Sequence, residues 1–96
     1  MPYLPKIVLH CTTGVPKGID ALVEAFIADG VKYVGVVGQD AALTEDIIDE
    51  CVVGDGSDDT RYILTASHKV ESVEYALEFA RSLTGEFEGE VQLVEV

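Results

Sequence analysis

KIVLHC, residues 6–11, is a nearly continuous apolar run that is rich in β-branched side chains. Such a run is typical of a strand that is covered on both faces, as in a parallel sheet. Residues 18–29 follow, and their apolar side chains recur at the spacing of one helical stripe. This stripe consists of Ile19, Leu22, Val23, Phe26 and Ile27. VKYVGVV, residues 31–37, then predicts a second strand, so the first third of the chain indicates a strand–helix–strand unit.

The remaining residues continue the same alternation. Thr44 is expected to cap a second helix, which ends at a turn rich in Gly and Asp. RYILTA, residues 61–66, predicts a third strand, and residues 72–83 predict a third helix with Ser72 as its cap. EVQLVEV, residues 90–96, is less uniformly apolar than the other strand segments and predicts an edge strand.

Residues 1–96 are therefore predicted to form one α/β domain. The order βα-βα-βα-β implies right-handed crossovers and a three-layer fold around a four-stranded, mainly parallel sheet of the Rossmann or flavodoxin-like type. We favour the strand order 2-1-3-4. That order places the first helix on one face of the sheet, the other two helices on the opposite face, and the switch point between strands one and three.

The charge balance limits the partners of the protein. Eighteen acidic residues stand against six basic ones, which gives a formal net charge of −12. Such a surface repels nucleic acids and anionic lipids, so we expect neither as a partner. The charge either serves solubility, or provides a docking face for a basic partner or a mimic of nucleic-acid charge.

The cysteines and the absence of recognised motifs bear on the compartment of the protein and on its cofactors. Cys11 and Cys51 do not make a disulfide framework, no signal peptide opens the sequence, and the apolar runs are too short to span a membrane. We therefore expect a cytoplasmic protein. No dinucleotide fingerprint, Walker loop or paired-cysteine zinc motif occurs in the sequence, so we expect no cofactor and no metal.

A ligand site is predicted where the three parallel strands end, because open parallel sheets bind ligands outside the carboxyl ends of their strands. The side chains expected to bind a ligand there are Thr12, Thr13, Asp40, His68 and Lys69. Lys17 and Lys69, together with the helix N-termini, would favour a small anion. The alternative is that both lysines are ordinary solvated loop residues.

The loop from Cys11 to Gly18, CTTGVPKG, suggests a second kind of chemistry. A thiol before a helix N-terminus can have a lowered pKa and act as a nucleophile or phosphoacceptor, with Lys17 beside it. The loop resembles the phosphocysteine loop of sugar-phosphotransferase IIB domains and, more distantly, the Cys-x5-Arg loop of low-molecular-weight tyrosine phosphatases. Lys17 replaces the phosphatase arginine, and Pro16 removes one backbone donor. The competing interpretation is that Cys11 is a small core residue.

A longer pattern in the middle of the chain resembles a known family. It consists of Gly38-Gln39-Asp40, Glu45-Asp46-x-x-Asp49, the segment Tyr62-Ile63-Leu64-Thr65-Ala66-Ser67-His68, and Glu71 and Glu74. Across residues 31–80 it is similar to a family of small bacterial proteins of unknown function, with a Gly-x-Asp and a strand ending in Thr-x-x-His. This chain has Thr44 and Ser67 where the family often has Trp. The resemblance implies a shared α/β fold and no activity.

The same pattern draws attention to Asp40 and His68, which both follow strands. An Asp–His pair has three interpretations: a structural hydrogen bond that ties two loops, a general-base pair, or an incomplete metal site. We rank the structural bond first. The function we favour is a non-catalytic binding or protein-interaction module, with dimerisation through the last strand or a helix face as one form of it. The alternative is a small-anion phosphoacceptor or phosphatase-like enzyme that uses the Cys11 loop.

Overall fold

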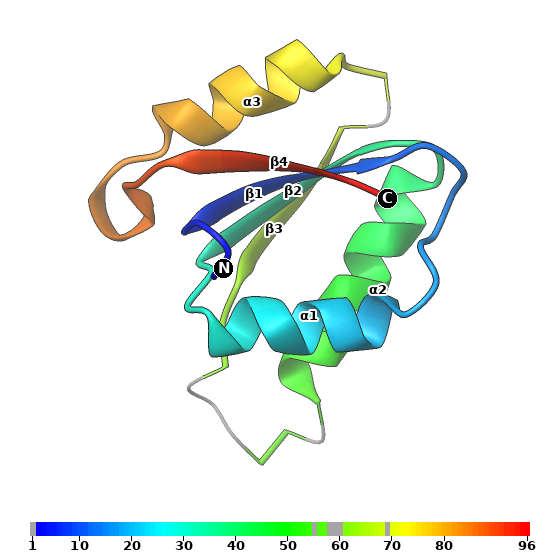
Figure 1. The fold of residues 1–96 in the computed structure, drawn as a ribbon, viewed down its shortest axis with the longest axis vertical. Coiled ribbons are helices and arrows are strands. Elements are labelled where there is room, and N and C mark those ends of the chain that lie inside the picture. The colour runs from blue at the N-terminus through cyan, green and yellow to red at the C-terminus, as the bar shows by residue number, and fades with distance from the viewer. Residues whose placement is uncertain (1, 55, 58–60, 69) are drawn as a thin grey trace.

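The computed structural model describes residues 2–54, 56–57, 61–68 and 70–96. Strands and helices alternate along the chain (Figure 1). The elements are β1 Lys6–Cys11, α1 Ile19–Ala28, β2 Tyr33–Gly38, α2 Ala41–Val53, β3 Leu64–His68, α3 Val73–Ser82, the 3-10 turn η1 Gly85–Phe87 and β4 Val91–Glu95. No helix in these ranges is long and apolar enough to cross a membrane.

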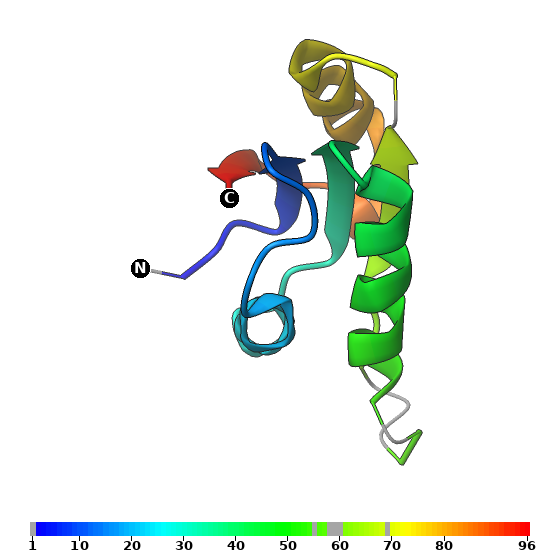
Figure 2. The ribbon, with the colours of Figure 1, turned by 90° about the vertical axis from the view of Figure 1, so that its right-hand side faces the viewer.

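The four strands form one sheet in the order β3-β2-β1-β4, and every neighbouring pair is parallel. The predicted parallel α/β fold is confirmed, and the predicted edge position of β4 is confirmed. The predicted order 2-1-3-4 is wrong, because β3 pairs with β2 and lies at the opposite edge from β4. Figure 2 shows α2 beside β3 on one side of the sheet and β4 on the other.

The layers also differ from the expectation. α1 and α2 lie together beneath the sheet and α3 lies alone above it (Figure 1). The chain moves in one direction across the sheet from β1 to β3, so two right-handed crossovers place their helices on the same face. The connection from β3 to β4 runs back across the sheet and places α3 on the other face. The switch point is therefore between β1 and β4.

Two predicted boundaries shift for identifiable reasons. α2 begins four residues earlier than expected, at Ala41, after Asp40 in a left-handed conformation with φ 57°. Thr44 consequently lies inside the helix and is buried rather than capping it. β3 begins only at Leu64, because its partner β2 begins at Tyr33, which aligns with Leu64. Before β3, the Arg61 side chain donates hydrogen bonds to the carbonyl oxygens of Val52 at the end of α2 (2.9 Å) and of Cys51 (2.7 Å).

Lys6 connects the central strand to the helix on the upper face. Its side chain is 1% exposed, and its ammonium donates hydrogen bonds to the carbonyl oxygens of Ala80 (2.7 Å) and Leu83 (3.0 Å). Ala80 lies in the last turn of α3 and Leu83 is its C-cap, and the helix dipole favours a cation at this end of a helix. The expected cap at the other end of α3 is confirmed, since Ser72 Oγ accepts a hydrogen bond from the Tyr75 backbone N–H.

Candidate functional site

The carboxyl ends of β1 and β4 meet at the switch point, where open parallel sheets place ligand sites. The pairing of these strands continues past their ends. The Val96 backbone N–H donates to the His10 carbonyl (3.0 Å), and the Thr12 backbone N–H donates to the Val96 carbonyl (3.1 Å). The Thr12 hydroxyl also donates to the Val96 carbonyl (3.0 Å), so Thr12 fixes this rim.

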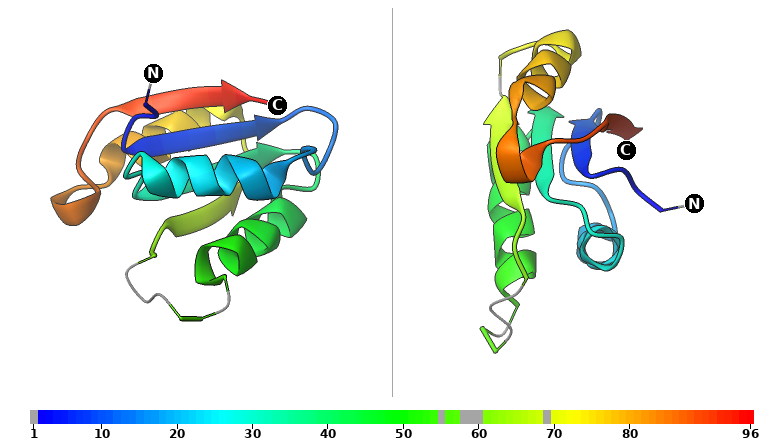
Figure 3. Two further views of the ribbon diagram at one scale, coloured as in Figure 1. Left: turned by 60° about the horizontal axis from the view of Figure 1, so that its bottom comes forward. Right: turned by 90° about the vertical axis from the view of Figure 1, so that its left-hand side faces the viewer.

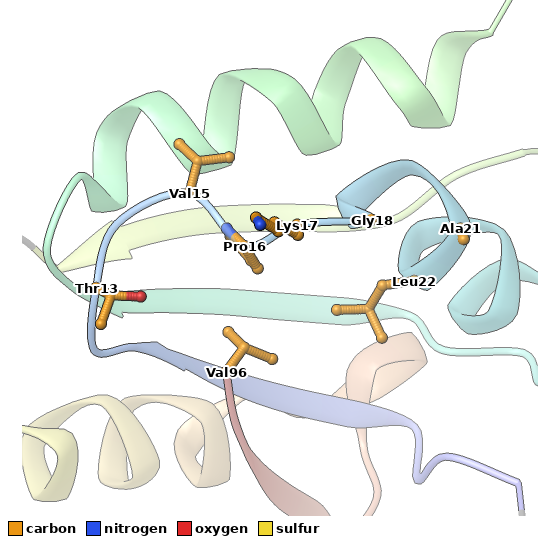
Figure 4. Close-up of a pocket in the computed structure, with 8 residues that line it drawn as sticks. All are labelled: Thr13, Val15, Pro16, Lys17, Gly18, Ala21, Leu22 and Val96. Carbon is orange, nitrogen blue, oxygen red and sulfur yellow. The ribbon is translucent and has the colours of Figure 1, made fainter.

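A groove of about 760 Å³ opens beneath this rim, between the end of β4 and the start of α1 (Figure 4). Its lining residues are Thr13, Val15, Pro16, Lys17, Gly18, Ala21, Leu22 and Val96. Pro16, Leu22 and Val96 point toward one another from the loop after β1, from α1 and from the end of β4 (Figure 4). Lys17 is the one charged residue in this lining, so the groove is mainly apolar.

A smaller hollow of about 280 Å³ lies elsewhere, lined by Lys32, Tyr62, Glu86 and Phe87. Lys32 immediately precedes β2 and Tyr62 precedes β3, so this hollow is at the amino ends of the strands. The switch-point groove is the better candidate, because it lies at the carboxyl ends, where the fold concentrates ligand sites.

Cys11 is not placed as a nucleophile would be. Its side chain is 1% exposed and packs into the core between the sheet and the helices beneath it. Burial raises the pKa of the Cys11 thiol, the adjacent Thr44 hydroxyl partly offsets this effect, and the Asp40 carboxylate adds a smaller increase. The Thr44 oxygen reaches no partner at ordinary hydrogen-bond geometry. A raised pKa is the opposite of what thiolate chemistry needs at neutral pH.

Asp40 and His68 face different sides of the sheet. The Asp40 carboxylate lies against Gly14 of the loop after β1, where an added Cβ would come within 2.9 Å of Asp40 Oδ2. His68 is 5% exposed, and its ring lies against Phe79 and Tyr75 of α3, at centroid separations of 5.4 and 5.8 Å. No hydrogen bond joins Asp40 to His68 among the described residues, and His68 Nε2 is buried without a partner.

The other residues predicted at the carboxyl ends of the strands do not all line the groove. Thr13 and Lys17 line the groove, whereas Thr12 is used to join β1 to residue 96. Lys69 lies outside the described residues. Whether any of these side chains binds a ligand stays a prediction.

Two acidic residues of α2 contact β3. The Thr65 hydroxyl lies 2.7 Å from Asp49 Oδ1 and 3.0 Å from Glu45 Oε2, which ties the helix to the edge strand. No cluster of three or more His, Cys, Asp or Glu side chains suited to a metal occurs in the described part of the chain.

The outer side of β4 belongs to the strand that the sequence predicted as an edge and as one route to dimerisation, but the sequence did not identify which residues face outward. β4 pairs with β1 through the backbone groups of alternate residues, as shown by the bonds from Lys6 N–H to Glu90 O and from Val96 N–H to His10 O. Successive residues of a strand direct these groups to opposite sides. The N–H and C=O groups of Val91, Leu93 and Glu95 therefore point away from the sheet.

Apolar side chains accompany these backbone groups. Leu93 is 41% exposed and Val96 is 37% exposed. Glu95 lies on the α3 face with Leu93, and its carboxylate is 3.0 Å from His10 Nδ1. Val96 lies on the other face, where it lines the groove. Alternation in the sequence VQLVEV was the available signal, but it does not reveal which residues bond inward.

Comparison with protein families gives one match. The profile of a domain of unknown function, DUF7684, matches residues 1–96. The chain belongs to the DUF7684 family. This finding confirms the resemblance to a family of unknown function, and it gives no support to the resemblance between the Cys11 loop and phosphotransferase IIB domains. No curated protein and no solved structure matches this DUF7684 chain.

Proposed function

We propose that the protein is a non-catalytic interaction module whose β4 edge takes up an extended segment of a partner protein as an additional strand. The observation that carries this proposal is the outward row of N–H and C=O groups at Val91, Leu93 and Glu95. An unpaired row of this kind is a template for strand addition, in which main-chain hydrogen bonds supply affinity and alternate side chains supply specificity.

The edge is accessible in the described part of the chain. In the left view of Figure 3, β4 forms the border of the sheet and only the N-terminal segment passes near its start. That segment directs its N–H groups elsewhere: Tyr3 N–H donates to Asp29 Oδ2 (3.0 Å) and Leu4 N–H donates to the Gln92 side chain (2.9 Å). β4 also contains neither Lys nor Pro, the residues that commonly protect edge strands.

The second edge of the sheet is a poorer template. The bond from Leu64 N–H to Lys32 O shows that Leu64, Ala66 and His68 direct their backbone groups inward to β2. Only Thr65 and Ser67 of β3 then point outward. α2 packs beside this strand, and the Thr65 side chain is bonded to it. β4 directs three residues outward, two of them apolar, whereas β3 directs two polar residues outward.

A selection from a library of short random peptides tests the proposal. Peptides enriched on the immobilised protein are compared for binding to wild type and to Leu93→Pro. Proline at this position removes an outward N–H but no bond to β1, and edge strands tolerate it there. We expect Leu93→Pro to keep the wild-type circular dichroism spectrum and to lose the selected peptides.

Leu93→Ser serves as the matched control, because it removes the apolar side chain and keeps the outward N–H. We expect Leu93→Ser to retain part of the binding that Leu93→Pro loses. Failure to select any peptide overturns the proposal. Selected peptides that bind folded Leu93→Pro as tightly as wild type overturn it as well.

A further inference from the structure

We infer that the strand bound at β4 is basic and inserts one aliphatic side chain into the switch-point groove. The inference rests on the proposed function and assigns a partner chemistry to the same site. It combines the charge of the side chains around β4 with the position of the groove relative to the β4 edge.

Acidic side chains lie at both ends of the edge. Glu88 and Glu90 come just before β4, both are exposed, and neither forms an ion pair with another described residue. Glu95 is the last residue of β4, its side chain is 64% exposed, and its one ionic partner within the described residues is His10. A basic strand would place its cations beside these carboxylates.

A second copy of this chain is a less favourable occupant than a basic strand. Each copy carries a formal net charge of −12, so association of two copies is opposed by electrostatic repulsion and becomes easier only as salt screens the charges. A basic partner shows the opposite dependence, because its attraction to Glu90 and Glu95 weakens with added salt.

The groove accounts for the aliphatic side chain of the bound strand. Side chains of β4 alternate between its faces, so Val96 lies beneath the sheet while Leu93 and Glu95 lie above it. A strand added to β4 alternates in the same way. Its side chains on the lower face lie beside Val96 and above Leu22 and Ala21, where the lining is apolar, and its side chains on the upper face lie beside Glu95 (Figure 4).

The predicted ligand pattern therefore alternates aliphatic residues with polar ones and carries cations at its ends. Two blocked synthetic peptides of this pattern, Ac-KVTVSVK-NH2 and Ac-EVTVSVE-NH2, differ only in the charge of the terminal side chains. We expect the basic peptide to bind at least about tenfold more tightly at ~0.05 M salt, and we expect this difference to shrink at ~0.5 M salt, where the screening length is only a few ångströms.

Three variants locate the interaction. Glu95→Gln is expected to weaken the basic peptide by about threefold, the effect of one exposed ion pair. Glu50→Gln removes the same charge from α2, at the far side of the sheet, and is expected to leave binding unchanged. Ala21→Phe partly fills the groove from an exposed position on α1, and is expected to weaken both peptides while the melting temperature stays the same.

The outcomes separate the two proposals. If both peptides bind equally and Leu93→Pro abolishes both, the edge function stands and the basic partner is wrong. If Ala21→Phe has no effect on binding, the groove is not part of the site. If sedimentation shows that salt promotes dimers that Leu93→Pro abolishes, the occupant is a second copy and the inference is overturned. If neither peptide binds and the library selection also fails, the proposed function itself is overturned.

Discussion

Replacing Lys6 with Met tests the attachment of α3 to the central strand. The Lys6 ammonium is buried and donates to two carbonyl oxygens at the C-terminal end of α3. A hydrogen bond from a charged group contributes about 1.5–3 kcal/mol, and a cation at a helix C-terminus adds about 0.3–1 kcal/mol. Methionine fills a similar volume and avoids the dehydration of an ammonium ion, which offsets part of the loss. We therefore expect Lys6→Met to lower the free energy of unfolding by about 2 kcal/mol.

Urea unfolding at neutral pH measures this change. With a slope near 2 kcal/mol per molar urea, a loss of about 2 kcal/mol lowers the midpoint by about 1 M. Lys32→Met is the matched control, because it removes the same charge from an exposed position before β2, and surface changes of this kind stay within about 0.5 kcal/mol. A Lys6→Met variant as stable as wild type would refute the reasoning that α3 depends on this contact.

Three further predictions test other parts of the structure, one by chemical labelling and two by substitution. Cys11 is buried and its pKa is raised, so iodoacetamide at neutral pH should modify the more exposed Cys51 first and Cys11 only when the chain unfolds; rapid labelling of native Cys11 in a mass spectrum would contradict this. The Arg61 guanidinium lowers the pKa of the Glu24 carboxyl, so the stability that Glu24 contributes is present above its unfolded pKa of about 4.3 and is lost as pH falls through the lower folded value. Wild type should therefore exceed Glu24→Gln in stability at neutral pH and match it in strong acid, whereas a difference independent of pH would disprove the ion pair as its cause. His68 Nε2 is buried beneath α3 without a partner, so His68→Phe should raise the free energy of unfolding by about 1 kcal/mol, and a marked loss in thermal unfolding would count against that placement.

The sequence was sufficient to predict the α/β class, because its decisive signals are local. β1 is a nearly continuous apolar run and is buried on both faces, and Ser72 caps α3 as its residue type suggests. The strand order was not predictable in the same way. It depends on which strand lies beside which, and β1 and β2 are similarly apolar and give no sign that β3 adds to β2. The polar Thr65 and Ser67 in β3 were the available indication of a second edge.

The candidate site was predicted only in part, because side-chain direction depends on strand register. His68 aligns with Val37 of β2, and both side chains face α3, so His68 cannot share a pocket with the Cys11 loop beneath the sheet. Thr44 illustrates the same limit within a helix. It has the residue type of a cap, but the left-handed Asp40 starts α2 earlier, and the Thr44 side chain is buried. The sequence predicted the β4 edge and dimerisation through it, but it did not identify the outward-facing residues, because their polar groups belong to the backbone.

Amide hydrogen exchange along β4, measured by NMR with and without a bound peptide, tests the central claim most directly. In the free protein we expect slow exchange at Gln92, Val94 and Val96, and fast exchange at Val91, Leu93 and Glu95. Saturation with Ac-KVTVSVK-NH2 should slow the exchange of the second group and leave the first group unchanged. Slow exchange at Leu93 and Glu95 in the free monomer, or peptide binding that leaves these two amides in fast exchange, would contradict an open edge that takes up a partner strand.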